Sequence, residues 1–345
     1  YEEPLEREIR PRGAGTFAIG ERWFNHLLER QHLLAVNSEF IAGDARAAMG
    51  KLENQLETEA RSLDASRTWR QQIAEAHRQH PEPLRLREAY EAEVLRAQRF
   101  VRERMSLPVV AGTLELLETP EYLQGETPFV GYQPPAPLGS EVVGSLLLTP
   151  VNFGLAPETQ DEMLRGHDEL TISLRVAREL WPGRHLEACA AVEPGSRLSR
   201  LAASALTTDG WALDATTQML EAEFFLDPRA RMFVLRERLE AAALALVDVD
   251  LHRGALEPAA AVELLTGRAL AHPATARAVV RRAALDPARS LCAFLGAELI
   301  HELREEWRSR GRDPFDRAAF HAEFLRTGCL PLFLVREQLQ ERAGG

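Results

Sequence analysis

The sequence predicts a mainly α-helical fold with a small β element near residues 108–150. Over most of the 345-residue chain, apolar side chains recur every three or four positions, which is the period of an amphipathic helix. Between residues 107 and 157 that period is interrupted by prolines and by one apolar run. In the second half, acid–proline and histidine–proline pairs are typical of helix starts. Together these observations favour helical bundles joined by a short β segment.

The N-terminal part, residues 20–106, is predicted to contain three amphipathic helices. Two lie between Ile19 and Ser62, and the third runs from Pro83 to Met105 with alternating Glu and Arg on its solvent face. Residues 1–19 are predicted to form an extended arm. The apolar positions that define the three helices are Phe24, Leu27, Leu28, Leu34, Met49, Leu52, Leu56, Leu63, Leu84, Leu86, Tyr90, Val94, Ala97 and Val101.

The segment 107–157 contains eight prolines, which a helix interior does not tolerate. Its run Glu-Val-Val-Gly-Ser-Leu-Leu-Leu-Thr over 141–149 is typical of a strand. We therefore predict two or three short strands and a long connection here. The prolines are Pro108, Pro120, Pro128, Pro134, Pro135, Pro137, Pro150 and Pro157.

Residues 158–345 are predicted to form a C-terminal helical bundle. The sequence has neither an internal repeat nor a low-complexity tract. We interpret 20–345 as a single domain with a long cleft between its N-terminal helices and this bundle. Helix starts are indicated at Asp209, Asp227-Pro228, Glu257-Pro258, His272-Pro273 and Asp286-Pro287. The predicted helices cover 158–181, 211–226, 229–252, 258–267, 273–284, 288–309 and 316–326.

Composition excludes several classes of function. A net charge of −11 without a contiguous basic stripe disfavours nucleic acid as a partner. No apolar run approaches the roughly 20 residues that cross a bilayer, and no signal peptide opens the sequence, so we expect a cytoplasmic protein. The three cysteines are far apart, which fits a reducing compartment and disfavours a structural zinc ribbon. A homo-oligomer is compatible with the sequence.

Five short motifs occur in the order and spacing of a known protein family, and the resemblance extends from about Gly20 to Leu334. The chain resembles a bacterial family catalogued as domain of unknown function 885 (DUF885), whose members are predicted zinc metallopeptidases of the gluzincin type. The resemblance implies a helical zincin/gluzincin-like scaffold. The motifs are Glu118-Thr-Pro120, Trp181-Pro-Gly-Arg-His-Leu-Glu187, Asp209-Gly-Trp-Ala-Leu213, Asp248-Val-Asp-Leu-His252 and the segment 320–332.

The central motif departs from the family pattern H-E-x-x-P-G-H-H-L-Q. Arg178 and Arg184 stand where that pattern has histidines, whereas Glu179, its presumed general base, and His185 are retained. Asp209 replaces the glutamate of E-G-W-A-L-Y, which the resemblance implies as a third metal ligand. Further on, a glutamate, a glutamine and two tyrosines of the family patterns are absent from 278–282 and 287–293, and the tyrosine that ends E-G-W-A-L-Y is also missing.

Arginine is a permanent cation without a free lone pair, so Arg178 and Arg184 would repel a dication rather than bind it. Catalytic zinc needs three protein ligands and one open position. We therefore predict no metal and no cofactor. Two arrangements stay open: the arginines form internal ion pairs with Glu179 and Asp209, or they form a fork for an anionic ligand.

Other candidates follow from the retained motifs. Asp248 and His252 share a helix face, and either line the cavity or form an i,i+4 pair that orients the imidazole. Arg281 keeps the arginine of the family and is a candidate for gripping a substrate carboxylate, with surface pairing as the alternative. Trp181 is expected in the core or in a cavity wall.

The favoured interpretation is a metal-independent enzyme that reuses a peptidase-like cavity on a small, anionic, amino-acid- or peptide-derived substrate. Its catalytic candidates are Glu179, His185, Asp209 and His252, and its substrate-binding candidates are Trp181, Arg178, Arg184, Asp248 and Arg281. The alternative is a catalytically inactive pseudo-peptidase that acts as a binding or partner subunit. A zinc hydrolase with relocated ligands is less favoured.

Overall fold

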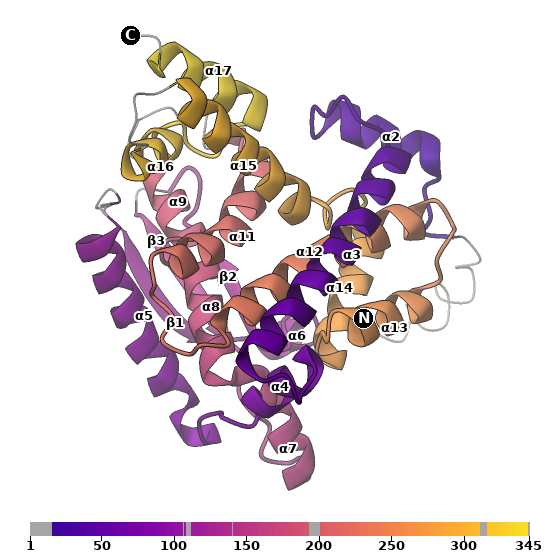
Figure 1. Ribbon diagram of the computed structural model, residues 1–345, viewed down its shortest axis with the longest axis vertical. Helices are drawn as coiled ribbons and strands as arrows, with labels where there is room; N and C mark the ends of the chain where they lie inside the picture. The colour runs from indigo at the N-terminus through magenta and orange to yellow at the C-terminus, as the bar shows by residue number, and fades with distance from the viewer. Residues whose placement is uncertain are drawn as a thin grey trace.

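The computed structural model describes residues 16–105, 107, 112–139, 141–192, 201–310 and 316–343, and is 66% helix and 5% strand. The prediction of a mainly helical fold with a small β element is confirmed (Figure 1). The predicted N-terminal arm lies almost wholly outside the described residues, and the assignment of 20–345 to one domain stays a prediction. No described helix is both long and apolar enough to span a membrane.

Four helices precede the sheet: α2 (Glu21–Arg30), α3 (Ser38–Leu63), α4 (Trp69–Ala76) and α5 (Leu86–Arg104). Helix α4 is absent from the sequence prediction, although a capping box marks its start: Thr68 accepts a hydrogen bond from the Gln71 amide while the Gln71 side chain returns to the Thr68 amide. Leu84 was expected on a buried face but lies in a 3-10 turn ahead of α5 and is 83% exposed.

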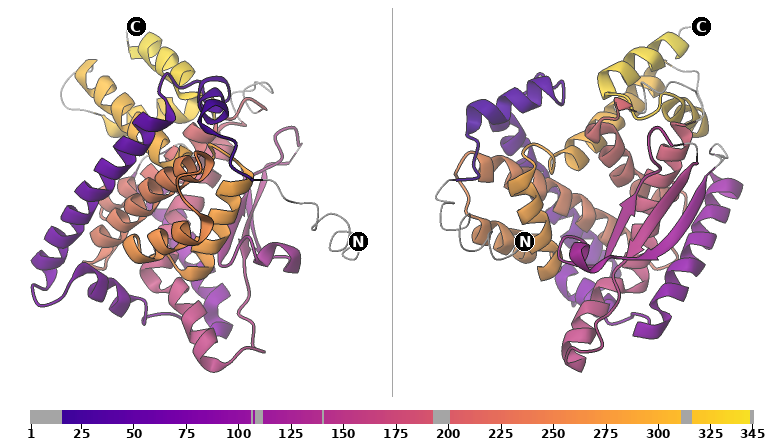
Figure 2. Two further views of the ribbon diagram at one scale, coloured as in Figure 1. Left: turned by 90° about the vertical axis from the view of Figure 1, so that its right-hand side faces the viewer. Right: turned by 180° about the vertical axis from the view of Figure 1, so that it is seen from behind.

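The small sheet has the strand order β1 (Thr113–Glu118), β3 (Val143–Leu148), β2 (Val130–Gln133). Strand β3 pairs parallel with β1 and antiparallel with β2, and the short helix α6 (Glu121–Gln124) lies between β1 and β2 in the chain. On the β1 edge, Arg87 of α5 donates to the carbonyl of Leu116 (2.6 Å). Figure 2 shows the strands running alongside α5 at one side of the molecule.

The helix predicted over 158–181 is in fact broken into α7 (Pro157–Leu164), a 3-10 turn (Arg165–His167) and α8 (Glu169–Glu179). The break occurs because the Asp168 side chain accepts the amide of Thr171 and starts a new helix. The remaining helices are α9 (Arg184–Ala190), α11 (Ala205–Glu221), α12 (Ala230–His252), α13 (Pro258–Arg268), α14 (Pro273–Leu285), α15 (Cys292–Arg310), α16 (Arg317–Arg326) and α17 (Leu332–Ala343).

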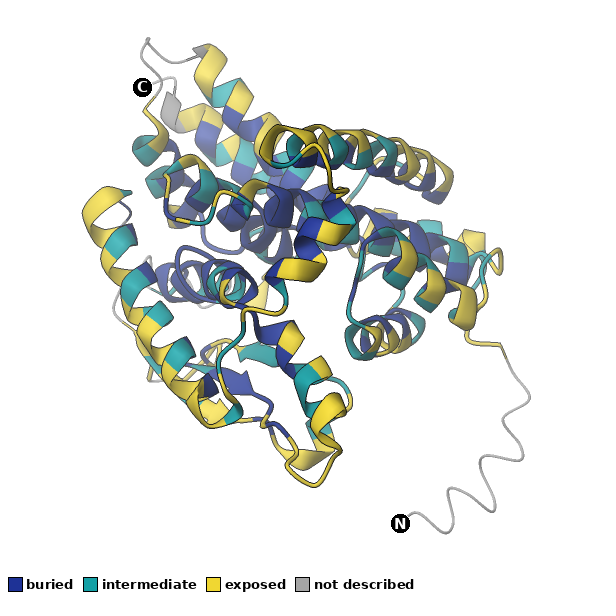
Figure 3. Cartoon of the chain, turned by 60° about the horizontal axis from the view of Figure 1, so that its bottom comes forward, coloured by how far each residue is buried: buried dark blue, intermediate teal, exposed yellow. Residues whose placement is uncertain are grey.

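Two helix pairs form the centre of the core. Helix α3 packs along α12, and α11 packs against α15 so closely that Gly210 and Gly296 meet backbone to backbone. Figure 3 shows the buried positions at the centre and the exposed ones along the outer helices. Helix α15 begins later than predicted because the Asp248 carboxylate binds the amides of Ala288, Ser290 and Leu291 in the preceding turn.

Candidate functional site

The central motif lies at the turn that joins α8 to α9. Gly183 is required here, because a Cβ at this position would overlap the Arg178 carbonyl and lie 2.6 Å from that of Ala177. The turn is held from α11 by the Trp211 indole, which donates to the Pro182 carbonyl (2.9 Å). The tight turn therefore places the end of α8 beside the start of α9 and against α11.

This turn brings the predicted residues Glu179, Arg184 and Asp209 into one ion-pair network. Arg184 donates to Asp209 (2.6 Å), and its Nε lies 3.4 Å from the Glu179 carboxylate. The second Asp209 oxygen pairs with Arg289, which aligns with the absent glutamine of the family pattern. Asp209 lies inside α11 rather than at its start, so its predicted role as a helix cap is wrong: its carboxylate is engaged by two guanidiniums.

Arg178 lies at the edge of this network. Its Nε is 3.8 Å from Glu179, and neither this Nε nor that of Arg184 has a hydrogen-bond partner among the described residues. The network holds three guanidiniums and two carboxylates, so it carries an excess of positive charge. Arg178, Arg184 and Arg289 are each about a quarter to a third exposed, so solvent and small anions can reach them.

His185 lies behind the network rather than in it. Its ring is fully buried, its Nδ1 is 3.0 Å from the Tyr132 hydroxyl, and it packs edge-on against Trp181. Burial lowers the pKa of His185 to about 4, so the imidazole is neutral at physiological pH. It is packed below β3, where a Cβ on Gly144 would lie 2.7 Å from its Nδ1. Trp181 itself is 8% exposed and serves as a wall of this packing.

The residues at the motif do not fit the zinc centre that the resemblance implies. The single retained imidazole is bonded to Tyr132, and the Asp209 carboxylate is taken by two arginines. Within the described part of the chain, no group of three or more His, Cys, Asp or Glu side chains is placed to hold a metal ion. Two cations beside Asp209 would repel a dication.

Zinc is accordingly expected to leave the melting temperature of the protein unchanged, and unsupplemented purified protein is expected to contain no stoichiometric zinc. Elemental analysis and a thermal melt with and without zinc measure both, with the Arg178→His/Arg184→His double variant as a comparison. Near-stoichiometric zinc in the wild type, or a stabilisation of several degrees that depends on His185 and Asp209, would contradict this expectation.

Three candidates from the sequence lie apart from the network. His252 is fully buried, stacks on Phe24 and has its Nε2 2.8 Å from the Ala283 carbonyl. Asp248 is also fully buried; burial raises its pKa to about 7, although its three backbone hydrogen bonds work to lower it. Arg281 pairs with Glu126 (2.7 Å) and donates to the Gly125 carbonyl. Asp248 thus holds the turn before α15 through backbone amides, and its Oδ1 lies 3.9 Å from the Nε2 of His252, which packs in the core. Arg281 forms a surface pair.

Two hollows open on either side of the network. The first, which we call the arginine cavity, has a volume of about 710 Å³ and lies between α4, α8, α12 and the start of α14. The second, the Asp209 hollow, has a volume of about 440 Å³ and lies between α9, α11 and the prolines after β2. Glu179 lines the first and Arg184 the second, so their contact lies on the boundary between the two hollows.

Five arginines and four glutamates line the arginine cavity, and Arg165 also pairs with Asp161 (2.8 Å). Arg70 and Arg175 have no carboxylate partner among the described residues: Arg70 stacks on Trp69, and Arg175 bonds to the Tyr90 hydroxyl. Glu237 is 8% exposed, and burial raises its pKa while nearby arginines lower it. The arginines around this cavity are Arg70, Arg165, Arg175, Arg178 and Arg236, and the glutamates are Glu162, Glu179, Glu237 and Glu240.

Four buried polar atoms of residues that line this cavity have no hydrogen-bond partner in the described part of the chain. Native proteins leave few such atoms, and each one costs about 1–3 kcal/mol unless a ligand or water satisfies it. The four are Arg70 Nη1, Arg178 Nε, Arg236 Nε and Glu237 Oε2.

The Asp209 hollow contains a second group of titratable side chains. Burial raises the pKa of Glu187 to about 8, and its Oε1 has no hydrogen-bond partner among the described residues. The pKa of Tyr132, on the same wall, is raised by burial and by the nearby Cys189 and acidic groups. Cys189, Cys292 and Cys329 are all buried free thiols.

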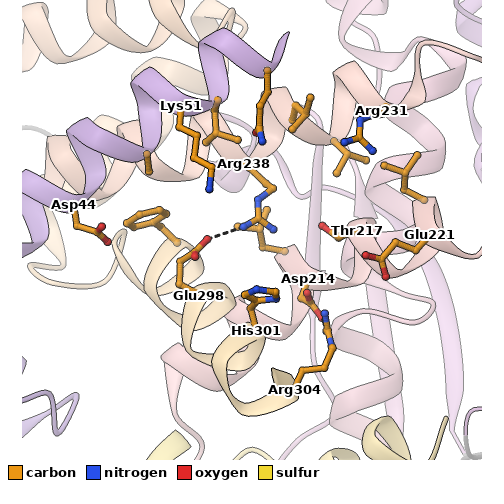
Figure 4. Close-up of a pocket in the computed structure, with 18 of the residues that line it drawn as sticks. Asp44, Lys51, Asp214, Thr217, Glu221, Arg231, Arg238, Glu298, His301 and Arg304 are labelled. Atoms are coloured by element: carbon orange, nitrogen blue, oxygen red, sulfur yellow. Dashed lines mark hydrogen bonds and ion pairs between the residues drawn. The ribbon is translucent and has the colours of Figure 1, made fainter. Parts of the chain in front are cut away.

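A third hollow of about 520 Å³ lies between α3 and helices α11, α12 and α15, where the sequence predicted a cleft (Figure 4). Its deepest charges are paired with each other. Arg304 contacts Asp214, the residue that replaces the tyrosine of the family pattern, and Arg238 donates to Glu298 (2.6 Å). Because these charges neutralise each other, this hollow offers less to a charged ligand than the arginine cavity does.

Sequence reasoning did not single out Arg236, Glu237, Tyr132 or Arg289. Arg236 and Glu237 lie in the middle of α12, where no local motif distinguishes them from the other charges of that helix. Arg289 lies in the stretch 287–293, whose motif positions had changed, and Tyr132 lies in β2, outside the motifs. Glu237 is the one of the four that a pattern within its own helix could have indicated, because it is a charged residue among apolar positions. The apolar neighbours Met232, Phe233, Val234 and Leu239 are all buried.

The family model of bacterial proteins of unknown function (DUF885) matches residues 1–339 of this chain. The chain belongs to the DUF885 family. The resemblance drawn from the motifs is therefore confirmed for the family, whereas a relation to gluzincins is not part of what the match shows. No match is found among curated proteins.

Two solved structures share the fold of this DUF885 member. A putative lipoprotein of unknown function from Shewanella oneidensis is 19% identical with a TM-score of 0.81, and the match covers 98% of this chain and 62% of that one. The putative lipoprotein from Colwellia psychrerythraea is 18% identical with a TM-score of 0.83, covering 94% and 55%. The chain thus spans less than two thirds of the length of either neighbour. At this identity the likeness shows the fold alone.

Proposed function

We propose that this protein binds a small anionic ligand, derived from an amino acid or peptide, in the arginine cavity, and acts on it without a metal. The single observation that carries the proposal is that Arg70 and Arg175 line this cavity without a carboxylate partner among the described residues. Guanidinium groups bind carboxylate or phosphate oxygens through charge-assisted hydrogen bonds.

The charge balance supports the same ligand class. The chain as a whole is acidic, with a net charge of −11, yet the cavity holds Arg70 and Arg175 without carboxylate partners among the described residues. Burial raises the pKa of Glu237, while Arg178, Arg236 and Arg175 work to lower it. A local positive field inside an acidic protein favours an anion at that point.

The proposal is tested by titrating the protein with citrate and with inorganic phosphate at constant ionic strength. Both anions are expected to raise the melting temperature, and Arg70→Gln and Arg178→Gln are each expected to weaken binding about tenfold or more, because each removes a charge-assisted hydrogen bond. Isothermal titration calorimetry gives the affinities. The matched control is Arg78→Gln, since Arg78 is exposed and lies outside the cavity. Equal binding by all four proteins, or no binding, would refute the site.

A second candidate function is that of a binding subunit without catalysis. It is favoured by Arg184, which is already engaged by both Glu179 and Asp209 and so is less available to a substrate. The two candidates share the ligand and differ in turnover: a binding subunit returns a bound compound unchanged. Analysis of the recovered ligand by mass spectrometry separates them.

A further inference from the structure

His77 lies at the C-terminal end of α4 and lines the arginine cavity. Its Nδ1 is 2.8 Å from a carboxylate oxygen of Asp168, and the side chain of Asp168 is 1% exposed while that of His77 is 23% exposed. The ring packs edge-on against Phe233, with centroids 5.6 Å apart. The imidazole is thus held in one orientation by a buried carboxylate and an aromatic ring.

This geometry fixes which nitrogen carries the proton. Burial works to raise the pKa of Asp168, but hydrogen bonds from His77 and Thr171 outweigh it and hold that pKa below its usual range, so the carboxylate is ionised and accepts. A neutral His77 therefore carries its proton on Nδ1 and leaves the lone pair on Nε2. Among the described residues, the hydrogen bond to Asp168 is the one that the His77 ring makes, and it involves Nδ1.

We infer that His77, oriented by Asp168, is the proton acceptor for a hydrolytic reaction in the arginine cavity, on an acyl compound that carries a carboxylate. This rests on the proposed function, because the arginines would hold the carboxylate of the substrate. Nε2 takes a proton from water as the water oxygen bonds to the acyl carbon. The bond from that carbon to the leaving group then breaks, and the proton passes to the leaving group. Water is the only co-reactant.

A neighbouring pair supplies a matched control. His80 follows His77 by three residues, and its Nε2 lies 3.2 Å from Asp161. His80 is not among the residues that line the cavity. His77→Asn and His80→Asn therefore each remove one histidine of a histidine–aspartate pair, and only the first changes the cavity.

The test measures hydrolysis of mono-4-nitrophenyl succinate, an activated ester with a free carboxylate, in the presence of EDTA, with neutral 4-nitrophenyl acetate as the comparison. The wild type and His80→Asn are expected to hydrolyse the succinate ester in preference to the acetate. His77→Asn is expected to lower kcat/KM about 100-fold or more, and Asp168→Asn to lower it less, while citrate affinity is kept in both.

Equal rates for the wild type and His77→Asn, or no hydrolysis by the wild type, would overturn the assignment of His77. Retained citrate binding in that case would leave the proposed ligand site standing, so the two failures are distinguishable. If His77→Asn does not fold, carbethoxylation of the wild type tests whether His77 is required for hydrolysis. Modification of His77 mapped by mass spectrometry should abolish hydrolysis and be blocked by citrate; loss of activity without modification of His77 would overturn the inference.

Discussion

Replacing Gly296 by alanine is expected to lower the free energy of unfolding by about 3 kcal/mol or more, the upper end for overpacking in a core. A Cβ at Gly296 would overlap the carbonyl oxygen of Leu206 and lie 2.8 Å from the Cα of Gly210. Both neighbours are backbone atoms of α11, so no side chain can turn aside. Helices α11 and α15 would have to move apart, and α11 carries Asp209.

Urea denaturation followed by circular dichroism measures this change. The control is Gly50→Ala in the middle of α3, where the new Cβ meets nothing within 4 Å. That substitution is expected to stabilise the protein by about 0.5–1 kcal/mol, because alanine loses less conformational freedom in a helix than glycine. A Gly296→Ala variant that unfolds at the urea concentration of the wild type would show that the helix crossing is not as tight as described.

Replacing Asp214 by alanine is expected to cost about 3–5 kcal/mol, because it leaves Arg304 buried without its counter-charge. The Asp214 and Arg304 side chains are 3% and 9% exposed, and the Asp214 carboxylate also accepts from Gln218 (2.8 Å). Thermal and urea melts measure the loss. Since well-packed apolar side chains often replace a buried pair without loss, Asp214→Leu/Arg304→Met is expected to recover much of the stability. A single variant as stable as the wild type would contradict the expectation.

The same pair predicts a sign for the pH dependence. Burial works to raise the pKa of Asp214, but Arg304 and Gln218 outweigh it and hold that pKa below its usual range. A carboxyl whose pKa is lower in the folded state stabilises the protein above its unfolded pKa of about 4, and this contribution is lost as the pH falls through the folded value. The stability difference between the wild type and Asp214→Ala should therefore shrink in acid.

Helical periodicity predicted most of the long helices because each buries one continuous face. It missed α4, which has only eight residues and is marked by a capping box rather than by a long apolar stripe. Helical periodicity also predicted one continuous helix across Asp168, where α8 in fact begins. In the sequence, a buried side chain that caps a helix resembles any other polar position within a periodic stretch. Local signals locate helix ends only where the capping side chain is recognised.

The motifs predicted the neighbourhood of Glu179, Arg184 and Asp209, since all three lie at one turn and the helix that holds it. They did not predict the arginine cavity. Its walls come from α4, α8, α12 and the start of α14, and residues such as His77 and Glu237 become neighbours only when these helices pack. The burial of His185 beneath β3 likewise depends on tertiary contacts, with Tyr132 and Gly144.

The contact between Glu179 and Arg184 favours ligands that stay within one hollow. A compound that fits wholly within the arginine cavity leaves that 3.4 Å contact intact, whereas one that extends from it into the Asp209 hollow has to separate two opposite charges. The free energy needed to part this ion pair therefore disfavours a ligand that occupies both hollows at once.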